Sequence, residues 1–210
     1  VSLTTSTSSA VSYNSSNHPA GDGTYRNGYD SISFDAVSKN VISIGSAGDA
    51  VSGGVRSVAN AYMASYSSWG PTDDGRIKPD VVANGEDVYS SFSANNTAYG
   101  TYSGTSMATP NACGSAALLI QYFSQQFPGQ AMRASTLKGL LIHTADDRGN
   151  AGPDYQFGWG LINVKAAADL IKAYQDAPGC VRMTESQINT TTTLRTHSFA
   201  WDGVSPIRAT

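Results

Sequence analysis

The residue types that could carry chemistry gather in one short string, Gly104-Thr105-Ser106-Met107-Ala108-Thr109-Pro110. A serine hydroxyl attacks a carbonyl carbon efficiently only when a base removes its proton. At a helix N-terminus the first backbone N–H groups lack acceptors and the dipole is positive, so both stabilise an oxyanion. Gly104 would admit a substrate backbone, and Pro110 is expected in the first turn, where it costs no hydrogen bond. A serine at a helix start is also typical of a plain N-cap.

Two further segments accompany this string. The first is Tyr66-Ser-Ser-Trp-Gly-Pro-Thr-Asp-Asp-Gly-Arg-Ile-Lys-Pro-Asp-Val-Val-Ala83, and the second is Gly158-Trp-Gly-Leu-Ile-Asn163. In this order, across residues 40–173, the three segments resemble the subtilases, the subtilisin-like serine peptidases, whose nucleophile motif is Gly-Thr-Ser-Met-Ala-x-Pro. The resemblance implies that Ser106 is the nucleophile and that its own N–H contributes to the oxyanion hole. Trp69 and Asn84 depart from the family, which has a small residue or arginine and a proline there.

The resemblance implies an α/β fold: the C-terminal part of a subtilisin-like three-layer parallel-sheet domain over residues 1–176. The composition then becomes threonine-rich. We expect a linker at 177–187 and the beginning of an all-β module at 188–210, which resembles the subtilase branch that carries a C-terminal β-sandwich.

Strands are expected to alternate with helices, a pattern typical of a parallel sheet covered on both faces. The expected strands are 40–45, 61–69, 78–85 and 155–162, with a further pair, 88–92 and 99–102, joined by an Asn95-Asn96 turn. The expected helices run from Ser106 to about Phe123, from Ala134 to Thr144 and from Val164 to Ala173, the last capped by Asn163.

The family orders its triad Asp, His, Ser along the chain, and the first two members are not recognisable here. The histidines, none in the His-Gly-Thr-His context of the family base, are His18, His143 and His197. We interpret His143 as a packed or half-exposed residue in the middle of a helix. The oxyanion-hole asparagine is not assigned either, because Asn14, Asn17 and Asn27 lack its Ala-Gly-Asn context.

These absences predict that the chain alone is essentially inactive and that its partner is an N-terminal segment of the same protein that carries Asp and His. The favoured function is a serine endopeptidase that cleaves peptides or proteins through an acyl-enzyme. The alternative is a non-catalytic module of subtilase fold, used for binding or assembly.

Residues just before the nucleophile are candidates for the substrate cleft, namely Tyr102, Ser103 and Gly104. The aromatic residues Tyr89, Phe92, Tyr99 and Tyr102 fit an extended peptide substrate and ordinary strand packing equally well.

Composition excludes several other classes of function. The net charge is −3 with a pI near 5.5, and no Lys/Arg run is present, so nucleic acid is not an expected partner. The longest apolar run, 116–120, is too short to cross a bilayer. The resemblance favours a secreted protein, although these residues include no signal peptide.

No cofactor is required by the expected chemistry, and no metal ligand is assigned. Asp73-Asp74 and Asp146-Asp147 are candidates for a structural calcium site, against the alternative of solvated turns. No His/Cys cluster suggests zinc. The two cysteines, Cys113 and Cys180, allow one disulfide, but Cys113 is expected to be a buried free thiol.

Overall fold

The computed structural model describes residues 29–176, 183–194, 196, 198, 203 and 204, together with the backbone of 2–4 and 10–12. The chain divides into two compact units. Unit 1 comprises Val1–Gly114 and Ala145–Ile162, and unit 2 comprises Ser115–Thr144 and Asn163–Thr210. Several residues considered above lie outside the described residues, namely His18, His197, Cys180, Asn14, Asn17 and Asn27.

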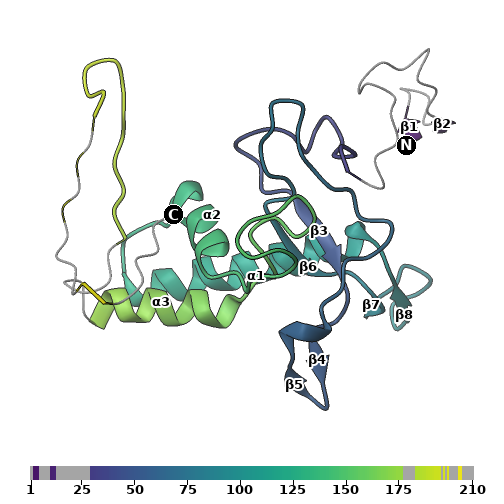
Figure 1. Ribbon diagram of the computed structural model, residues 1–210. Coiled ribbons are helices and arrows are strands. Elements are labelled where there is room, and N and C mark those ends of the chain that lie inside the picture. Colours follow the sequence, from purple (N-terminus) through teal and green to yellow (C-terminus); the bar gives the residue numbers. More distant parts are fainter. Residues whose placement is uncertain are drawn as a thin grey trace. The chain divides into compact units, whose positions relative to one another are not determined.

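The centre of unit 1 is a parallel pair of strands, β3 (Ile44–Ala47) and β6 (Val81–Asn84) (Figure 1). Their register pairs Ile44 with Val81 and Ala47 with Asn84. Val81 and Val82 are fully buried, as expected for β-branched residues in a parallel sheet covered on both faces. The expected strand at 78–85 is therefore confirmed in a shorter form, whereas the strand expected at 40–45 begins only at Ile44 and continues to Ala47.

The other edge of β6 is paired by a loop rather than by the strand expected over 155–162. Val82 N donates to Gly160 O over 3.0 Å, and Ile162 N donates to Val82 O over 3.0 Å. Only isolated bridges form there, because Gly160 has a φ of +118° and lies against Asp146. A Cβ on Gly160 would stand 2.1 Å from Asp146 O, so this close approach requires glycine.

The strand expected over 61–69 is wrong. That segment makes turns, with one isolated bridge between Met63 and Ala47. Its buried residues, Ala61, Ala64 and Ser67, recur every third position, so the alternation expected of a strand does not hold.

A buried ion pair anchors the chain just before β3 and β6. Lys78 is 2% exposed and Asp80 6%, and Lys78 Nζ lies 2.7 Å from Asp80 Oδ2. Lys78 Nζ also donates to Ser43 Oγ over 3.1 Å, and Ser43 N donates to Asp80 Oδ2 over 2.7 Å. The pair thus joins the residue before β3 to the residue before β6, and its charges are compensated by hydrogen bonds.

Three antiparallel pairs of short strands complete the strands of unit 1 that the structure describes. They are β1 (Ser2–Thr4) with β2 (Ala10–Ser12), β4 (Val51–Ser52) with β5 (Val55–Arg56), and β7 (Val88–Ser91) with β8 (Tyr99–Tyr102). The β7–β8 pair confirms the expected hairpin. A short 3-10 helix, η1 (Val58–Asn60), follows β5.

The helices are α1 (Thr105–Gln126), α2 (Ala134–His143) and α3 (Val164–Asp176). Asn163 caps α3 as expected, because its Oδ1 accepts from Ala166 N over 2.9 Å. Pro110 is the sixth residue of α1, so its expected place in the first turn is wrong. With no N–H, it leaves the carbonyl of Ser106 without the donor that a helix normally supplies.

In unit 2 the ring of Phe127 lies 4.8 Å from that of Phe123 and 5.6 Å from that of Tyr174, between centroids. His143 is half-buried, as expected, but it is the last residue of α2 and does not lie in the middle of the helix. No described helix is both long and apolar enough to cross a membrane. The domain boundaries at 177–187 and 188–210 remain predictions, since much of that tail lies outside the described residues.

Candidate functional site

Ser106 is exposed and is the second residue of α1. The chain reaches it from β8 through Ser103 and Gly104. The carbonyl of Gly104 accepts from Met107 N over 2.9 Å and from Ala108 N over 3.1 Å, which closes the first turn. The N–H of Ser106 precedes these bonds and has no acceptor within the helix. The local geometry therefore presents a hydroxyl and a free amide donor at the positive end of a helix.

Two glycines bring the carboxyl end of the sheet against this turn. Gly104 N donates to Gly85 O over 2.7 Å, and Gly85 directly follows β6. A Cβ on Gly85 would lie 2.3 Å from Ser46 Oγ and 2.6 Å from Gly104 O. Glycine is therefore required at 85 because β3, β6 and the start of α1 meet there.

Tyr66 supports the same junction. Its hydroxyl donates to Gly85 O over 3.1 Å and lies 3.1 Å from Ser46 Oγ. Burial raises the pKa of the Tyr66 phenol above its usual value, so the neutral O–H donor persists over a wider pH range. Sequence reasoning missed Gly85 and Tyr66 as residues that position the site. The signal for Gly85 was its place directly after a buried strand, and Tyr66 begins one of the segments that resemble the family, although no role was assigned to it.

The residues expected to line a substrate cleft lie at the base of the β7–β8 hairpin. Asp87 N donates to Ser103 Oγ over 2.9 Å, which fixes the loop before Gly104. Two aromatic pairs stack on the hairpin, with centroid distances of 5.5 Å for Tyr89 with Tyr99 and 5.3 Å for Phe92 with Tyr102. All four rings are nevertheless between 41% and 70% exposed. Strand packing and an available aromatic surface thus occur together.

A base for Ser106 is missing from the described part of unit 1, which contains no histidine. His143, the histidine that the structure describes, belongs to unit 2. The described residues of unit 1 therefore offer a nucleophile and an amide donor but no imidazole that could accept the proton.

Asp74 and Asp146, two of the aspartates considered for calcium, have protein partners. Asp74 accepts from Arg76 Nε over 2.8 Å and from Thr72 Oγ1 over 2.6 Å. The hydrogen bond from Arg76 contributes most, and that from Thr72 less, to lowering the pKa of Asp74 to about 2. Asp146 pairs with Arg56 over 2.5 Å. Within the described ranges no three His, Cys, Asp or Glu residues form a group that could hold a metal ion. A structural calcium site remains a prediction.

Cys113 is exposed, so the expected burial of its thiol is wrong. The first half of α1 buries Ala108 and Ala112 instead. Cys113 follows Ala112 by one residue, which turns its side chain about 100° around the helix and away from the buried side.

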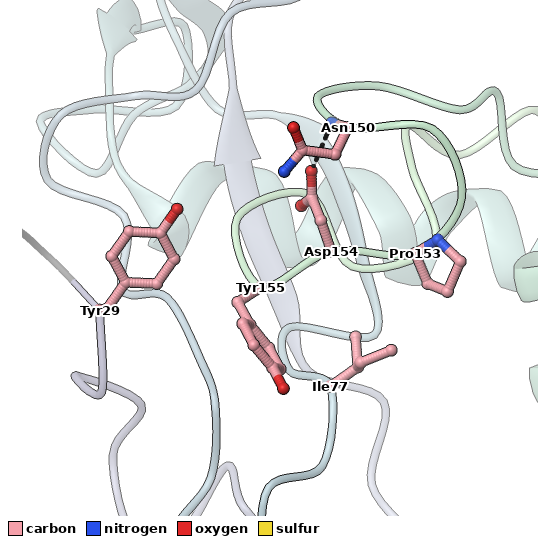
Figure 2. A pocket seen from close by; sticks show the side chains of 6 residues that line it. All are labelled: Tyr29, Ile77, Asn150, Pro153, Asp154 and Tyr155. Atoms are coloured by element: carbon pink, nitrogen blue, oxygen red, sulfur yellow. Dashed lines mark hydrogen bonds between the residues drawn. The ribbon is translucent and has the colours of Figure 1, made fainter.

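One pocket of about 300 Å³ lies at the loop after Asp147 and is lined by Tyr29, Ile77, Asn150, Pro153, Asp154 and Tyr155. Figure 2 shows the Asp154 carboxylate turned toward Asn150, whose backbone N–H donates to Asp154 Oδ2 over 2.9 Å. The other carboxylate oxygen accepts from Gln156 N over 2.9 Å and from Phe157 N over 2.7 Å. Both carboxylate oxygens of Asp154 are therefore engaged in shaping its own loop.

A second pocket, of about 400 Å³, lies beside β3 and the start of α1. Its walls include Ile42, Ile44, Ser67, Thr105 and Thr109. Thr105 directly precedes Ser106, so this hollow lies close to the candidate nucleophile.

Comparison with known proteins decides the family. The model of the subtilase family matches residues 14–160, about two thirds of the chain. The chain belongs to the subtilase family. The subtilase resemblance inferred from the motif segments is thereby confirmed.

Subtilases are also found among its curated relatives. The C5a peptidase of Streptococcus pyogenes is 35% identical over 114 residues, covering 50% of this chain and 10% of that protein. Subtilisin DY of Bacillus licheniformis is 37% identical over 110 residues, covering 52% of this chain and 34% of that protein. An extracellular serine protease of Serratia marcescens is 34% identical over 127 residues, 57% of this chain and 12% of that protein. The chain thus matches at most about a third of the length of these relatives.

Solved structures of two proteases confirm the α/β fold. The CspB protease of Clostridium perfringens superposes with a TM-score of 0.57 at 28% identity, over 69% of this chain and 29% of that one. The patellamide maturation protease PatA superposes with a TM-score of 0.55 at 26% identity, over 70% of this chain and 48% of that one.

Proposed function

We propose that this chain is the nucleophile-bearing part of a secreted serine endopeptidase, and that Ser106 is its nucleophile. The observation that carries the proposal is the exposed Ser106 hydroxyl at the first turn of α1, beside an amide donor with no acceptor in the helix. Membership of the subtilase family supports the reaction class, and the relatives named C5a peptidase and extracellular serine protease support peptide or protein substrates outside the cell.

The base and its orienting carboxylate would come from a segment of the same polypeptide outside these residues. Its histidine accepts the proton of Ser106 Oγ while that oxygen bonds to the scissile carbonyl carbon. The Ser106 N–H donates to the oxyanion that forms, because it lies next to the attacking oxygen. The histidine returns its proton to the leaving amine as the C–N bond breaks, and water then hydrolyses the acyl-enzyme.

The substrate cleft in this proposal includes Tyr102, Ser103 and Gly104. Gly104 presents no side chain next to the reacting bond, and Ser103 is fixed by its bond with Asp87. Tyr102 is exposed on β8, two residues before Gly104. An extended peptide would therefore meet an aromatic ring beside the site of attack.

The direct test measures peptide hydrolysis by the full polypeptide with Ser106→Ala, and with Ser124→Ala as the matched control. Ser124 is another exposed serine of α1, in its last turn. Loss of the nucleophile should lower kcat by about 10⁶, whereas Ser124→Ala should leave it unchanged. Full activity in the Ser106→Ala variant would refute the proposal.

The alternative is a module of subtilase fold that binds without catalysis. The described part of unit 1 favours it in one respect, because no histidine is present there. The complete coding sequence separates the two functions. An Asp motif and a His-Gly-Thr-His-like motif upstream would support the enzyme, and their absence would support the binding module.

A further inference from the structure

The carbonyl of Gly85 holds the turn that carries the candidate nucleophile. Its oxygen accepts from Gly104 N over 2.7 Å, and Gly104 O in turn accepts from Met107 N over 2.9 Å. Gly104, two residues before Ser106, is therefore fixed through both its N–H and its C=O. A shift of the Gly85 carbonyl would move Gly104 and the start of α1 with it. Misplacement of a reacting group by about 1 Å can cost on the order of 100-fold in rate.

The same carbonyl has a second donor, from a distant part of the chain. The Tyr66 hydroxyl donates to Gly85 O over 3.1 Å, across 19 positions of the sequence. A hydroxyl has a single proton, so the Tyr66 oxygen is the acceptor toward Ser46, whose Oγ lies 3.1 Å away. The bonds thus run from the Ser46 hydroxyl to the Tyr66 hydroxyl and on to the Gly85 carbonyl. In such a chain each hydrogen bond polarises and strengthens the next.

The segment 64–67 is tied to Ser46 of β3 in a way that presents this hydroxyl. Ser46 O accepts from Ala64 N over 3.0 Å, and Ser46 N donates to Ser67 Oγ over 3.0 Å. Ser46 itself is fully buried, whereas the Tyr66 ring between these contacts is 45% exposed. The specific contacts of Tyr66 are therefore made by its hydroxyl. The turns found in place of the expected strand bring that hydroxyl to Gly85.

We propose that Tyr66, supported by Ser46, is a positioning residue for Ser106. This inference rests on the proposed function. The Tyr66 hydroxyl holds the Gly85 carbonyl against Gly104 N, and so determines where the Ser106 hydroxyl and N–H point. Tyr66 touches neither the substrate nor the reacting atoms in this role. Loss of one neutral hydrogen bond of this kind should lower the rate on the order of five- to tenfold.

The proton of Tyr66 gives this contact a signature that packing alone would lack. Burial contributes most to raising the pKa of the Tyr66 phenol above 10.0, and Glu86 and Tyr62 add to it, whereas the hydrogen bond with Ser46 acts in the opposite direction. Below the raised pKa the phenol donates to Gly85 O, and above it the phenolate has no proton to donate. The reaction of Ser106 should therefore slow as the pH rises through that pKa.

Tyr66→Phe in the full polypeptide removes the hydroxyl and keeps the ring. The rate of phosphonylation of Ser106 and the kcat for peptide hydrolysis should both fall on the order of five- to tenfold, with KM unchanged. Tyr62→Phe is the matched control, because Tyr62 is an exposed tyrosine of the same segment, and it should leave both rates unchanged at neutral pH. Equal rates in Tyr66→Phe and the unmodified protein would overturn the inference.

The pH profile separates positioning from a loss of stability. The unmodified protein should react more slowly at alkaline pH, and Tyr66→Phe should lack the part of this decrease that Tyr66 causes. A difluorinated tyrosine at position 66 keeps the ring and the hydroxyl but has a more acidic phenol, so the decrease should move to lower pH. This protein keeps the test decisive if Tyr66→Phe is less stable. The same alkaline profile in all three proteins would overturn the inference.

The supporting role of Ser46 is tested by a double-mutant cycle. Ser46→Ala alone should lower the phosphonylation rate by a smaller factor than Tyr66→Phe does, because it removes the donor to Tyr66 and leaves the bond to Gly85 in place. In the Tyr66→Phe background it should have little further effect, since residues in one hydrogen-bonded network do not act additively. Losses that simply multiply would show that Ser46 does not act through Tyr66, and would overturn that part of the inference.

Failure of the inference can be told apart from failure of the proposed function. If Ser106 of the unmodified full polypeptide reacts with neither phosphonylating reagents nor peptides, both are refuted. If Ser106 reacts, and reacts at the same rate and with the same pH dependence in Tyr66→Phe, the positioning role alone is refuted and the protease function stands.

Discussion

The two central strands of unit 1 differ in how completely this chain supports them. Strand β6 is paired on one edge by β3 and on the other by the loop at 160–162. Strand β3 is paired by β6 but is closed only at Ser46 on its other edge. Among the described residues, β6, which leads to the nucleophile turn, is paired on both edges, whereas β3 is paired fully on one edge alone. The variants below test which contacts support β3 and β6.

The largest effect is expected from Asp80→Asn, which removes one charge of the buried pair before β6. The Lys78 ammonium would remain buried without its carboxylate, so the free energy of unfolding should fall by about 3–5 kcal/mol. Chemical denaturation of the full polypeptide measures this. A loss no greater than that of Asp74→Asn, which removes an exposed partner of Arg76, would show that the pair does not anchor the strands.

A smaller loss is expected from Gly85→Ala, at the junction of both strands with α1. The new methyl group would lie 2.3 Å from Ser46 Oγ and 2.6 Å from Gly104 O. Overpacking of this kind costs about 1–3 kcal/mol, and it should also slow the reaction of Ser106 with phosphonylating reagents. Gly139→Ala in α2 is the control, because no atom lies within 4 Å of its added methyl group. Wild-type behaviour of Gly85→Ala would contradict the account of the junction.

The loop that completes β6 is tied to β5 by Arg56, which pairs with Asp146 and donates to Ile162 O over 3.0 Å. Lysine keeps the charge but loses the planar fork. Because Arg56 is partly exposed, Arg56→Lys should cost about 1 kcal/mol or less, measured as a small decrease in Tm. A loss as large as that of Asp80→Asn would mean that this loop contributes more to β6 than the buried pair does.

The smallest effect concerns Asp74, whose pKa is lowered from 3.8 to about 2 by hydrogen bonds from Arg76 and Thr72. A carboxyl group whose pKa is lowered by folding stabilises the folded state at any pH above its unfolded pKa of 3.8. That stabilisation is lost as the pH falls toward the folded pKa of about 2. Asp74→Asn should therefore slightly reduce the dependence of stability on pH between pH 4 and pH 2. Measuring Tm at a series of acidic pH values checks this. If Tm depends on pH identically in the variant and the unmodified protein, the hydrogen bonds of Asp74 do not contribute to stability.

Sequence reasoning predicted the parts of the fold that depend on local chemistry. The start of α1, one residue before the expected Ser106, the β7–β8 hairpin and the Asn163 cap follow from turn residues and capping residues close in the chain. The structure of segment 61–69 was not predicted correctly, because this segment contacts β3 through turns and not as a strand. Its aromatic residues alternate only in part, and the buried positions follow a spacing of three.

In the candidate site, too, residues within a contiguous motif were predicted, whereas residues brought together by the fold were not. Ser106 was found because the whole motif is contiguous, whereas Tyr66 contacts Gly85 across 19 positions of the chain. Cys113 was misjudged because small neighbours suggested burial, although burial on a helix depends on which side faces the core.

The most direct test of the central claim is the reaction of a fluorophosphonate with Ser106, located by peptide mass spectrometry. We expect label on Ser106 in the full polypeptide, none in Ser106→Ala, and almost none in this chain alone, because the described part of unit 1 has no histidine. Label on a different serine of the full polypeptide, with Ser106 unmodified, would contradict the account.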